Sequence, residues 1–131
     1  MLDITGIDHI VLRARDGEGL VRFYTEVLGL TVERRQDAIG LVQLRAGRNL
    51  IDIVPVDGKL GRMGGAAPGA EGRNLDHFCL NIRDFDIDRV KAHLEAHGVE
   101  LGEEGLRYGA GGEGLSIYLK DPEGNGVELR G

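Results

Sequence analysis

The sequence predicts an α+β fold built from two βαβββ modules related by internal duplication. The main observation is a repeat: residues 7–16 (IDHIVLRARD) return as residues 75–84 (LDHFCLNIRD), 68 positions later and with five identities in ten. A second echo, near the end of each half, pairs NLIDI at residues 49–53 with NGVEL at 125–129. Third, both halves show one helical and four extended hydrophobic patterns in the same order.

Module one begins with an apolar, β-branched run at residues 4–13, which predicts a strand. Alternation along that strand places His9 and Arg13 on the same face. Apolar side chains recur at helical spacing over residues 18–28, so we expect a helix that ends at Gly29. Three further strands are expected at residues 31–35, 39–45 and 49–54.

Module two repeats this order. We expect a strand at residues 75–82 and a helix at 87–97 that ends at Gly98. The remaining strands are expected at residues 99–103, 115–120 and 126–130, the last two joined by the turn DPEGN.

Glycine is frequent, with 22 residues in 131, and much of it lies in two segments, residues 57–73 and 108–114. Both segments are predicted to be mobile loops. The first separates the halves, so we expect a single domain of residues 1–131 with module one at about 1–56, a glycine-rich crossover at 57–73 and module two at about 74–131.

Composition excludes several functions. The 16 basic and 22 acidic residues give a net charge of −6 without any basic run, so we expect no nucleic acid and no membrane among the partners. No apolar run approaches the roughly 20 residues needed to span a bilayer, and no signal peptide is recognisable, so we expect a cytoplasmic protein. The single Cys79 excludes an intrachain disulfide and is predicted to be a buried thiol.

The duplication brings metal-ligand residue types to matching positions. His9 and His77 open the two halves, and Asp52 and Glu128 close them. Two imidazoles and two carboxylates suit a first-row divalent ion, with coordination positions left for a chelating substrate. Two carboxylates in apolar strands are costly to bury unless a cation compensates them. The alternative is that all four are strand-end polar groups satisfied by the backbone.

Weaker candidates lie elsewhere. His93 and His97 have a helical i, i+4 spacing that can bind zinc, but no third ligand accompanies them, so surface and core packing are the favoured explanation. The string GAGGEG at residues 109–114 satisfies G-x-G-x-x-G but precedes a strand rather than a helix, so it does not predict a dinucleotide site. Asn81 and Tyr118 are candidate polar groups of the cavity.

Three segments also carry a resemblance: the repeated Asp-His start, FYTEVLGL in the first helix, and SIYLKDPEGNGVEL at the end. These segments resemble the vicinal oxygen chelate superfamily, and the resemblance covers nearly the whole chain. That superfamily includes glyoxalase I, fosfomycin-resistance thiol transferases, methylmalonyl-CoA epimerase, extradiol dioxygenases and metal-free bleomycin-binding proteins. The resemblance implies a curved mixed sheet around a metal-binding cavity, and a homodimer.

The ligand positions of glyoxalase I map onto His9, Asp52, His77 and Glu128. An arginine four residues after the first histidine contacts glutathione in that enzyme, and Arg13 stands there; its alternative role is an exposed strand-end charge. This chain departs from glyoxalase I in two places. Asp52 replaces a longer glutamate, and Val56 replaces an asparagine. Both departures leave glutathione specificity open.

The resemblance implies three functions. The first is a glyoxalase I-like lyase or isomerase that binds nickel, zinc, manganese or iron and acts on a small vicinal-oxygen substrate, such as a thiol adduct, through a metal-stabilised enediolate. Glu128 would be its base, and Asp52 the second choice. The others are an extradiol-type dioxygenase or thiol transferase on the same metal, and a non-catalytic binding or resistance protein. The modules could pair within a chain or between two chains, and the crossover could be a lid or a passive connector.

Overall fold

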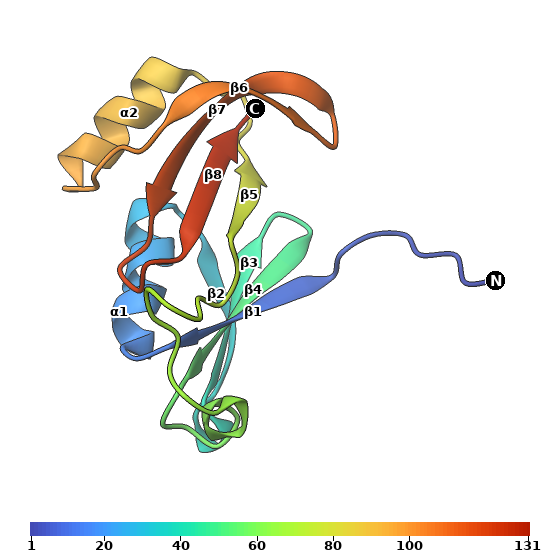
Figure 1. The fold of residues 1–131 in the computed structure, drawn as a ribbon, viewed down its shortest axis with the longest axis vertical. Helices are drawn as coiled ribbons and strands as arrows, with labels where there is room; N and C mark the ends of the chain where they lie inside the picture. The colour runs from blue at the N-terminus through green and yellow to red at the C-terminus, as the bar shows by residue number, and fades with distance from the viewer. The chain divides into compact units, whose positions relative to one another are not determined.

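The computed structural model describes residues 1–131 and divides them into two compact units, Met1–Pro68 and Gly69–Gly131 (Figure 1). Each unit contains one four-stranded mixed sheet and one main helical segment. The predicted duplication of a βαβββ module is therefore confirmed. No helix has both the length and the apolar character required to cross a membrane.

The first unit forms its sheet in the order β1-β4-β3-β2, with β1 parallel to β4 and the other neighbours antiparallel. Its helical segment follows β1 directly. The elements are β1 His9–Ala14, α1 Gly17–Arg22, the π-helix η1 Phe23–Val27, β2 Thr31–Gln36, the 3-10 turn η2 Asp37–Ile39, β3 Leu41–Ala46 and β4 Asn49–Pro55, followed by the 3-10 turn η3 Gly61–Gly64.

The second unit repeats the topology with the strand order β5-β8-β7-β6, and β5 is parallel to β8. A parallel pair cannot be joined by a tight turn, and α2, β6 and β7 all lie between β5 and β8 in sequence, as the corresponding elements do in the first unit. The elements are β5 His77–Asn81, α2 Ile87–Ala96, β6 Glu104–Gly109, β7 Gly112–Lys120 and β8 Gly126–Arg130.

The helices begin and end where local chemistry dictates. The Asp86 carboxylate accepts from the first backbone N–H groups of α2, and Asp16 does the same for α1. Gly29 and Gly98 follow the two helical segments with φ of 77° and 71°, a conformation that favours glycine. Both glycine stops predicted from the sequence are confirmed.

Alternating strand residues build the cores. Leu12 on β1 and Ile53 on β4 are paired in register and fully buried, and Val127 is fully buried on β8. The opposite face of β1 carries His9, and that of β8 carries Glu128. Alternation thus places the candidate ligands on the face away from each core.

Three predictions of local structure are wrong. Residues 4–8 precede β1 without strand pairing. The strand expected at residues 99–103 is instead β6 at Glu104–Gly109. The loop expected at residues 108–114 is a hairpin, in which Gly109 pairs with Gly112 around a two-residue turn. The glycine-rich sequence predicted a loop because glycines give no alternating hydrophobic pattern. The segment forms a strand nevertheless, because its backbone pairs with β7.

Candidate metal and substrate site

The first unit brings His9 and Asp52 together. The two side chains come from the paired strands β1 and β4, and His9 Nε2 lies 4.0 Å from Asp52 Oδ2. Asp52 is only 4% exposed, and both its oxygens accept from Gln43 Nε2 at 3.3 Å. His9 Nδ1 contacts Asp8 Oδ1 at 2.7 Å. The imidazole is thus fixed on one side while its Nε2 faces a buried carboxylate.

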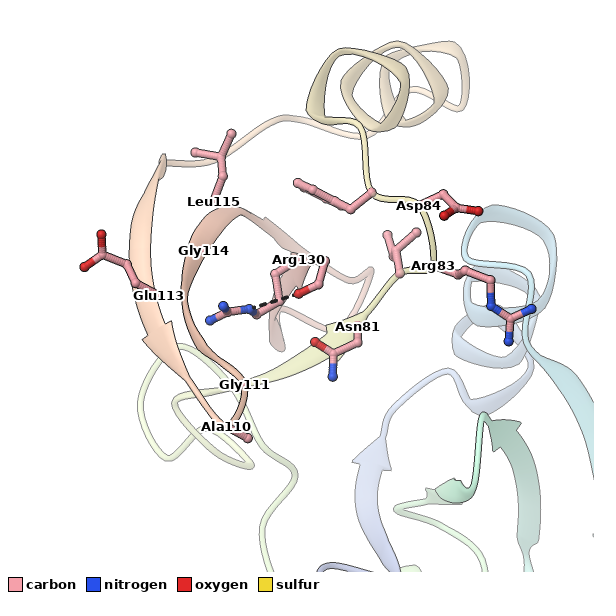
Figure 2. Close-up of a pocket in the computed structure, with 12 residues that line it drawn as sticks. Asn81, Arg83, Asp84, Ala110, Gly111, Glu113, Gly114, Leu115 and Arg130 are labelled. Atoms are coloured by element: carbon pink, nitrogen blue, oxygen red, sulfur yellow. Dashed lines mark hydrogen bonds between the residues drawn. The ribbon is translucent and has the colours of Figure 1, made fainter.

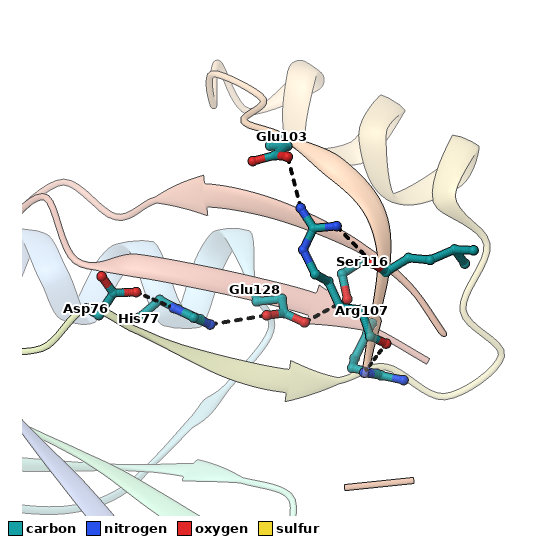
Figure 3. A network of polar contacts seen from close by, with 8 residues as sticks. Asp76, His77, Glu103, Arg107, Ser116 and Glu128 are labelled. Atoms are coloured by element: carbon teal, nitrogen blue, oxygen red, sulfur yellow. Dashed lines mark hydrogen bonds and ion pairs between the residues drawn. The ribbon is translucent and has the colours of Figure 1, made fainter. Parts of the chain in front are cut away.

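The second unit repeats this arrangement more tightly (Figure 3). His77 Nε2 lies 3.2 Å from Glu128 Oε1, and His77 Nδ1 lies 2.6 Å from Asp76 Oδ2. Ser116 Oγ donates to Glu128 Oε2 at 2.7 Å. Asp76, His77, Glu128 and Ser116 therefore form a continuous polar chain across β5, β8 and β7.

We define the paired residues His9 with Asp52, and His77 with Glu128, as the two half-sites. In each, a histidine from the first strand meets a carboxylate from the last strand, and the preceding aspartate holds Nδ1. Metal-binding histidines commonly pair their second nitrogen with a carboxylate in this way. The donor chemistry therefore fits a divalent cation. No group of three or more metal-ligand side chains gathers in the structure, so each half-site supplies two ligand-type residues.

The electrostatics of the half-sites favour the charged forms of His9 and Glu128. The hydrogen bond to Asp8, followed by the charge of Asp52, raises the pKa of His9. Burial alone would raise the pKa of Glu128, but hydrogen bonds from Ser116, Tyr118 and Cys79 outweigh it and lower that pKa below the ordinary value. Glu128 is thus kept ionised although it is almost completely buried. An ionised carboxylate is the form that binds a cation.

Tyr118, predicted as a polar group of the cavity, lies beside the second half-site. Its ring meets the His77 imidazole edge-on, with the ring centres 5.4 Å apart, and the Arg107 guanidinium lies 5.5 Å from its ring centre. The hydrogen bond to Glu128, together with burial, raises the pKa of Tyr118. The hydroxyl therefore stays protonated and donates a hydrogen bond to Glu128.

Arg13 lies on the face that carries His9, but its guanidinium contacts the crossover. It donates to the carbonyls of Gly61, Gly65 and Ala66 at 2.9, 2.8 and 2.9 Å. These contacts bind the beginning of the crossover to β1. Asn81 is exposed at the end of β5, in register with Arg130 on β8.

Cys79 corrects one prediction, because it is exposed rather than buried. It follows the alternation of His77, on the polar face of β5, instead of that of Leu80. Desolvation and the nearby Glu128 carboxylate raise the pKa of its thiol to about 12. Cys79 is thus a neutral thiol at physiological pH and a poor nucleophile.

The other histidine pair has no such supporting groups. His93 and His97 lie with their ring centres 4.5 Å apart on α2, and His97 Nδ1 is 2.9 Å from the His93 carbonyl oxygen. No carboxylate joins them in a metal-type cluster. The structure thus agrees with the surface-packing interpretation of this pair.

Sequence reasoning missed the groups that support the half-sites, namely Asp8, Asp76, Gln43 and Ser116. The repeated Asp-His dipeptide was a usable signal for the first two, because the same residue precedes both histidines. Gln43 and Ser116 come from neighbouring strands, and only the sheet register identifies them.

The family follows from comparison with known proteins. Residues 6–129 match the model of the Glyoxalase/Bleomycin resistance protein/Dioxygenase superfamily, so the chain belongs to this family, the vicinal oxygen chelate proteins. Its members are mostly enzymes that typically use divalent metals, bind small molecules and often form dimers.

Particular relatives narrow the comparison. The chain is similar to the glyoxalase domain-containing protein RDO1 of Mycosarcoma maydis, at 33% identity over 129 residues, which cover 98% of this chain and 69% of that protein. It is also 31% identical over 132 residues to the virulence protein STM3117 of Salmonella typhimurium strain LT2, covering 96% of this chain and 83% of that protein. The crystal structure of STM3117 superposes with a TM-score of 0.79 at 26% identity, covering 98% of each chain.

A lactoylglutathione lyase from Agrobacterium tumefaciens shares the fold. Its TM-score is 0.71 at 24% identity, over 97% of this chain and 93% of that one.

Proposed function

We propose that the protein is a metal-dependent lyase or isomerase, similar to glyoxalase I, that acts on a small substrate with two vicinal oxygens. The observation that supports this proposal is the repeated aspartate–histidine–carboxylate arrangement of the two half-sites. An Nδ1 partner and both candidate ligands recur together in the two units, on the strand faces opposite the cores.

The proposed ligands of one divalent ion, whether nickel, zinc, manganese or iron, are His9, Asp52, His77 and Glu128. Such an ion supplies Lewis-acid polarisation of the two substrate oxygens and stabilises the charge of an enediolate. The modules that provide the two half-sites pair within one chain or between the two chains of a homodimer.

Within the proposed mechanism the carboxylates move the proton. Glu128, which is ionised at neutral pH because its pKa is lowered, accepts the proton next to the substrate carbonyl and returns it to the neighbouring carbon. Ser116 holds Oε2 of Glu128, and Oε1, which lies 3.2 Å from His77 Nε2, is the proposed acceptor of the proton. Asp52 is the alternative base. Tyr118 is a proposed substrate-binding group, and its single O–H group would turn from Glu128 to a substrate oxygen.

A second candidate function has a specific observation in its favour. The Gln43 amide donates to both Asp52 oxygens, and the His9 to Asp52 distance of 4.0 Å exceeds the 3.2 Å of the other half-site. If Asp52 stays on Gln43, two histidines and one carboxylate remain as ligands. That set suits an extradiol-type dioxygenase or a thiol transferase, which needs more open coordination positions. A non-catalytic binding protein is the third alternative.

Metal content tests these proposals. We expect wild-type protein purified without chelator to contain about one divalent ion per complete ligand set, measured by elemental analysis. His77→Ala should lose the ion, whereas the matched control His93→Ala should retain it. Loss in Asp52→Ala as well supports four ligands, and retention supports the three-ligand alternative. A wild-type protein that neither contains metal nor takes up added nickel, zinc, manganese or iron would contradict both enzyme proposals.

A further inference from the structure

The second unit contains a pocket of about 710 Å³ at the end of its sheet, beyond the half-site (Figure 2). It lies between the end of β5 with the loop that follows and the tip of the β6–β7 hairpin, and Arg130 of β8 forms part of its wall. Neither the candidate ligands nor the proposed proton transfers use this pocket.

Arg130 is a buried cation without a side-chain carboxylate partner. The residue is only 7% exposed, and its guanidinium donates to two main-chain carbonyls, those of Arg107 at 3.2 Å and Gly112 at 2.9 Å, and at a longer 3.4 Å to a backbone oxygen of Gly131, the last residue. No Asp or Glu side chain offsets this charge, and an incompletely paired buried charge is costly. An anion in the pocket would remove that cost.

The geometry leaves donors for such an anion. A guanidinium has five N–H groups, and these three contacts use one on each nitrogen. One N–H group therefore remains on each terminal nitrogen, and N–H groups on two nitrogens of a guanidinium can bind both oxygens of a carboxylate. The amide of Asn81 is the neighbour of Arg130 in register on β5 and lines the same pocket.

Two glycines make room for the guanidinium. A Cβ atom added at Gly109 would lie 2.4 Å from Arg130 Nη1, and one added at Gly114 would lie 2.6 Å from Nη2. Neither glycine has a left-handed φ that would require glycine for the backbone. Their lack of side chains thus serves to admit the arginine.

The other charged residues of the pocket do not compensate Arg130. Figure 2 shows the carboxylates of Asp84 and Glu113 directed outward from the wall, away from the guanidinium, and Arg83 also extends away. Among the charged side chains, Arg130 is therefore the one that faces the pocket.

We propose that Arg130, with Asn81, forms a carboxylate-binding subsite. Arg130 lies two residues after Glu128 on the same strand face, so the subsite is about 7 Å from the candidate metal ligand along the strand. The substrate of the site would thus be a small organic acid whose carboxylate lies about that far from its two chelating oxygens. That placement of the substrate rests on the proposed function, whereas the carboxylate subsite does not.

The test is an NMR titration of the full chain, labelled with ¹⁵N, stripped of metal and kept in Tris chloride at constant ionic strength. The probe is succinate, and the uncharged control is succinamide. We expect succinate to shift the backbone amide signals of residues 81, 111–114 and 131 in a saturable manner, and succinamide to leave them unchanged.

Three variants identify the binding group. Arg130→Gln should weaken succinate binding by about tenfold, as expected when a charge-assisted pair is lost. Gly114→Ala keeps the charge but displaces the guanidinium, so it should also weaken binding by several fold. Arg89→Gln removes an exposed arginine on α2 and should bind like the wild type. If Arg130→Gln does not fold, Gly114→Ala decides the question.

The proposal is overturned if wild-type signals do not saturate, if succinamide binds equally well, or if Arg130→Gln and Gly114→Ala bind like the wild type. Tighter binding of inorganic phosphate than of succinate would overturn the assignment to carboxylates. Because the protein is metal-free, succinate binding that persists while the metal-content experiment fails contradicts the proposed function alone and supports the subsite.

Discussion

At the scale of single residues, the charge of the second half-site depends on the hydrogen bonds that keep the buried Glu128 carboxylate ionised. Glu128 is 6% exposed, and burial by itself favours its neutral form. The Ser116 hydroxyl, donating at 2.7 Å, is the foremost of the hydrogen bonds that reverse this preference. In the first unit, Asp52 accepts from the Gln43 amide on the neighbouring strand β3, so in both units the buried carboxylate is hydrogen-bonded by a side chain from the adjacent strand.

This balance predicts the effect of Ser116→Ala on stability. The pKa of Glu128 is lowered in the folded state, so its stabilising contribution is present above the unfolded pKa and is lost as the pH falls through the folded pKa. Removing the Ser116 donor should raise that folded pKa and reduce the free energy of unfolding at pH 7 by about 1–3 kcal/mol.

Urea unfolding of metal-stripped protein between pH 3 and pH 7 measures this effect. The difference between Ser116→Ala and wild type should shrink toward acid pH, where Glu128 is protonated in both proteins. A difference that is constant across the range would show that Ser116 acts through packing alone.

At the scale of elements, the β6–β7 hairpin shows how glycine serves opposite purposes in one segment. Gly112 has a φ of 104°, which side-chain-bearing residues rarely adopt. Gly111 in the turn has no such φ, and a Cβ there would meet nothing within 4 Å. Gly114 has an ordinary backbone but faces Arg130. Gly112 is therefore required by its backbone conformation and Gly114 by the packing of Arg130. No such requirement applies at Gly111.

The hairpin supplies a matched pair of variants. Gly112→Ala should lower the free energy of unfolding by about 1–3 kcal/mol, because alanine is strained at that φ. Gly111→Ala should be close to neutral, and thermal unfolding of the two variants beside wild type measures the contrast. Equal stability of both variants would contradict a conformational requirement at Gly112.

At the scale of the whole molecule, the proposed ligand set would need two modules. Each unit has one pair of a histidine and a carboxylate, and the proposed set of four combines one pair of each kind. In a family whose members often form dimers, the two half-sites can belong to one chain or to two.

Mixing two defective variants distinguishes these arrangements. His9→Ala disables the first half-site and Glu128→Ala disables the second, so each variant alone should lack metal. If ligand sets form between chains, mixed dimers contain one intact set and one doubly altered set, and co-refolded equal mixtures should regain about a quarter of the wild-type metal content. If sets form within a chain, every set carries one defect and none is regained. A mixture that regains metal without forming dimers would contradict both arrangements.

The sequence by itself determined the duplicated βαβββ topology, the helix stops at Gly29 and Gly98, and the family. Strand and helix periodicity and the glycine that ends a helix are local features of the sequence. They therefore predict the elements without any information about which strands are neighbours. Tertiary structure decided what sheet register controls: the hairpin at residues 104–120, the donors Gln43 and Ser116, and the glycine-lined place of Arg130. Those contacts join residues from different strands. The spacing of residues along the chain therefore does not predict that Arg130 packs against Gly109 and Gly114.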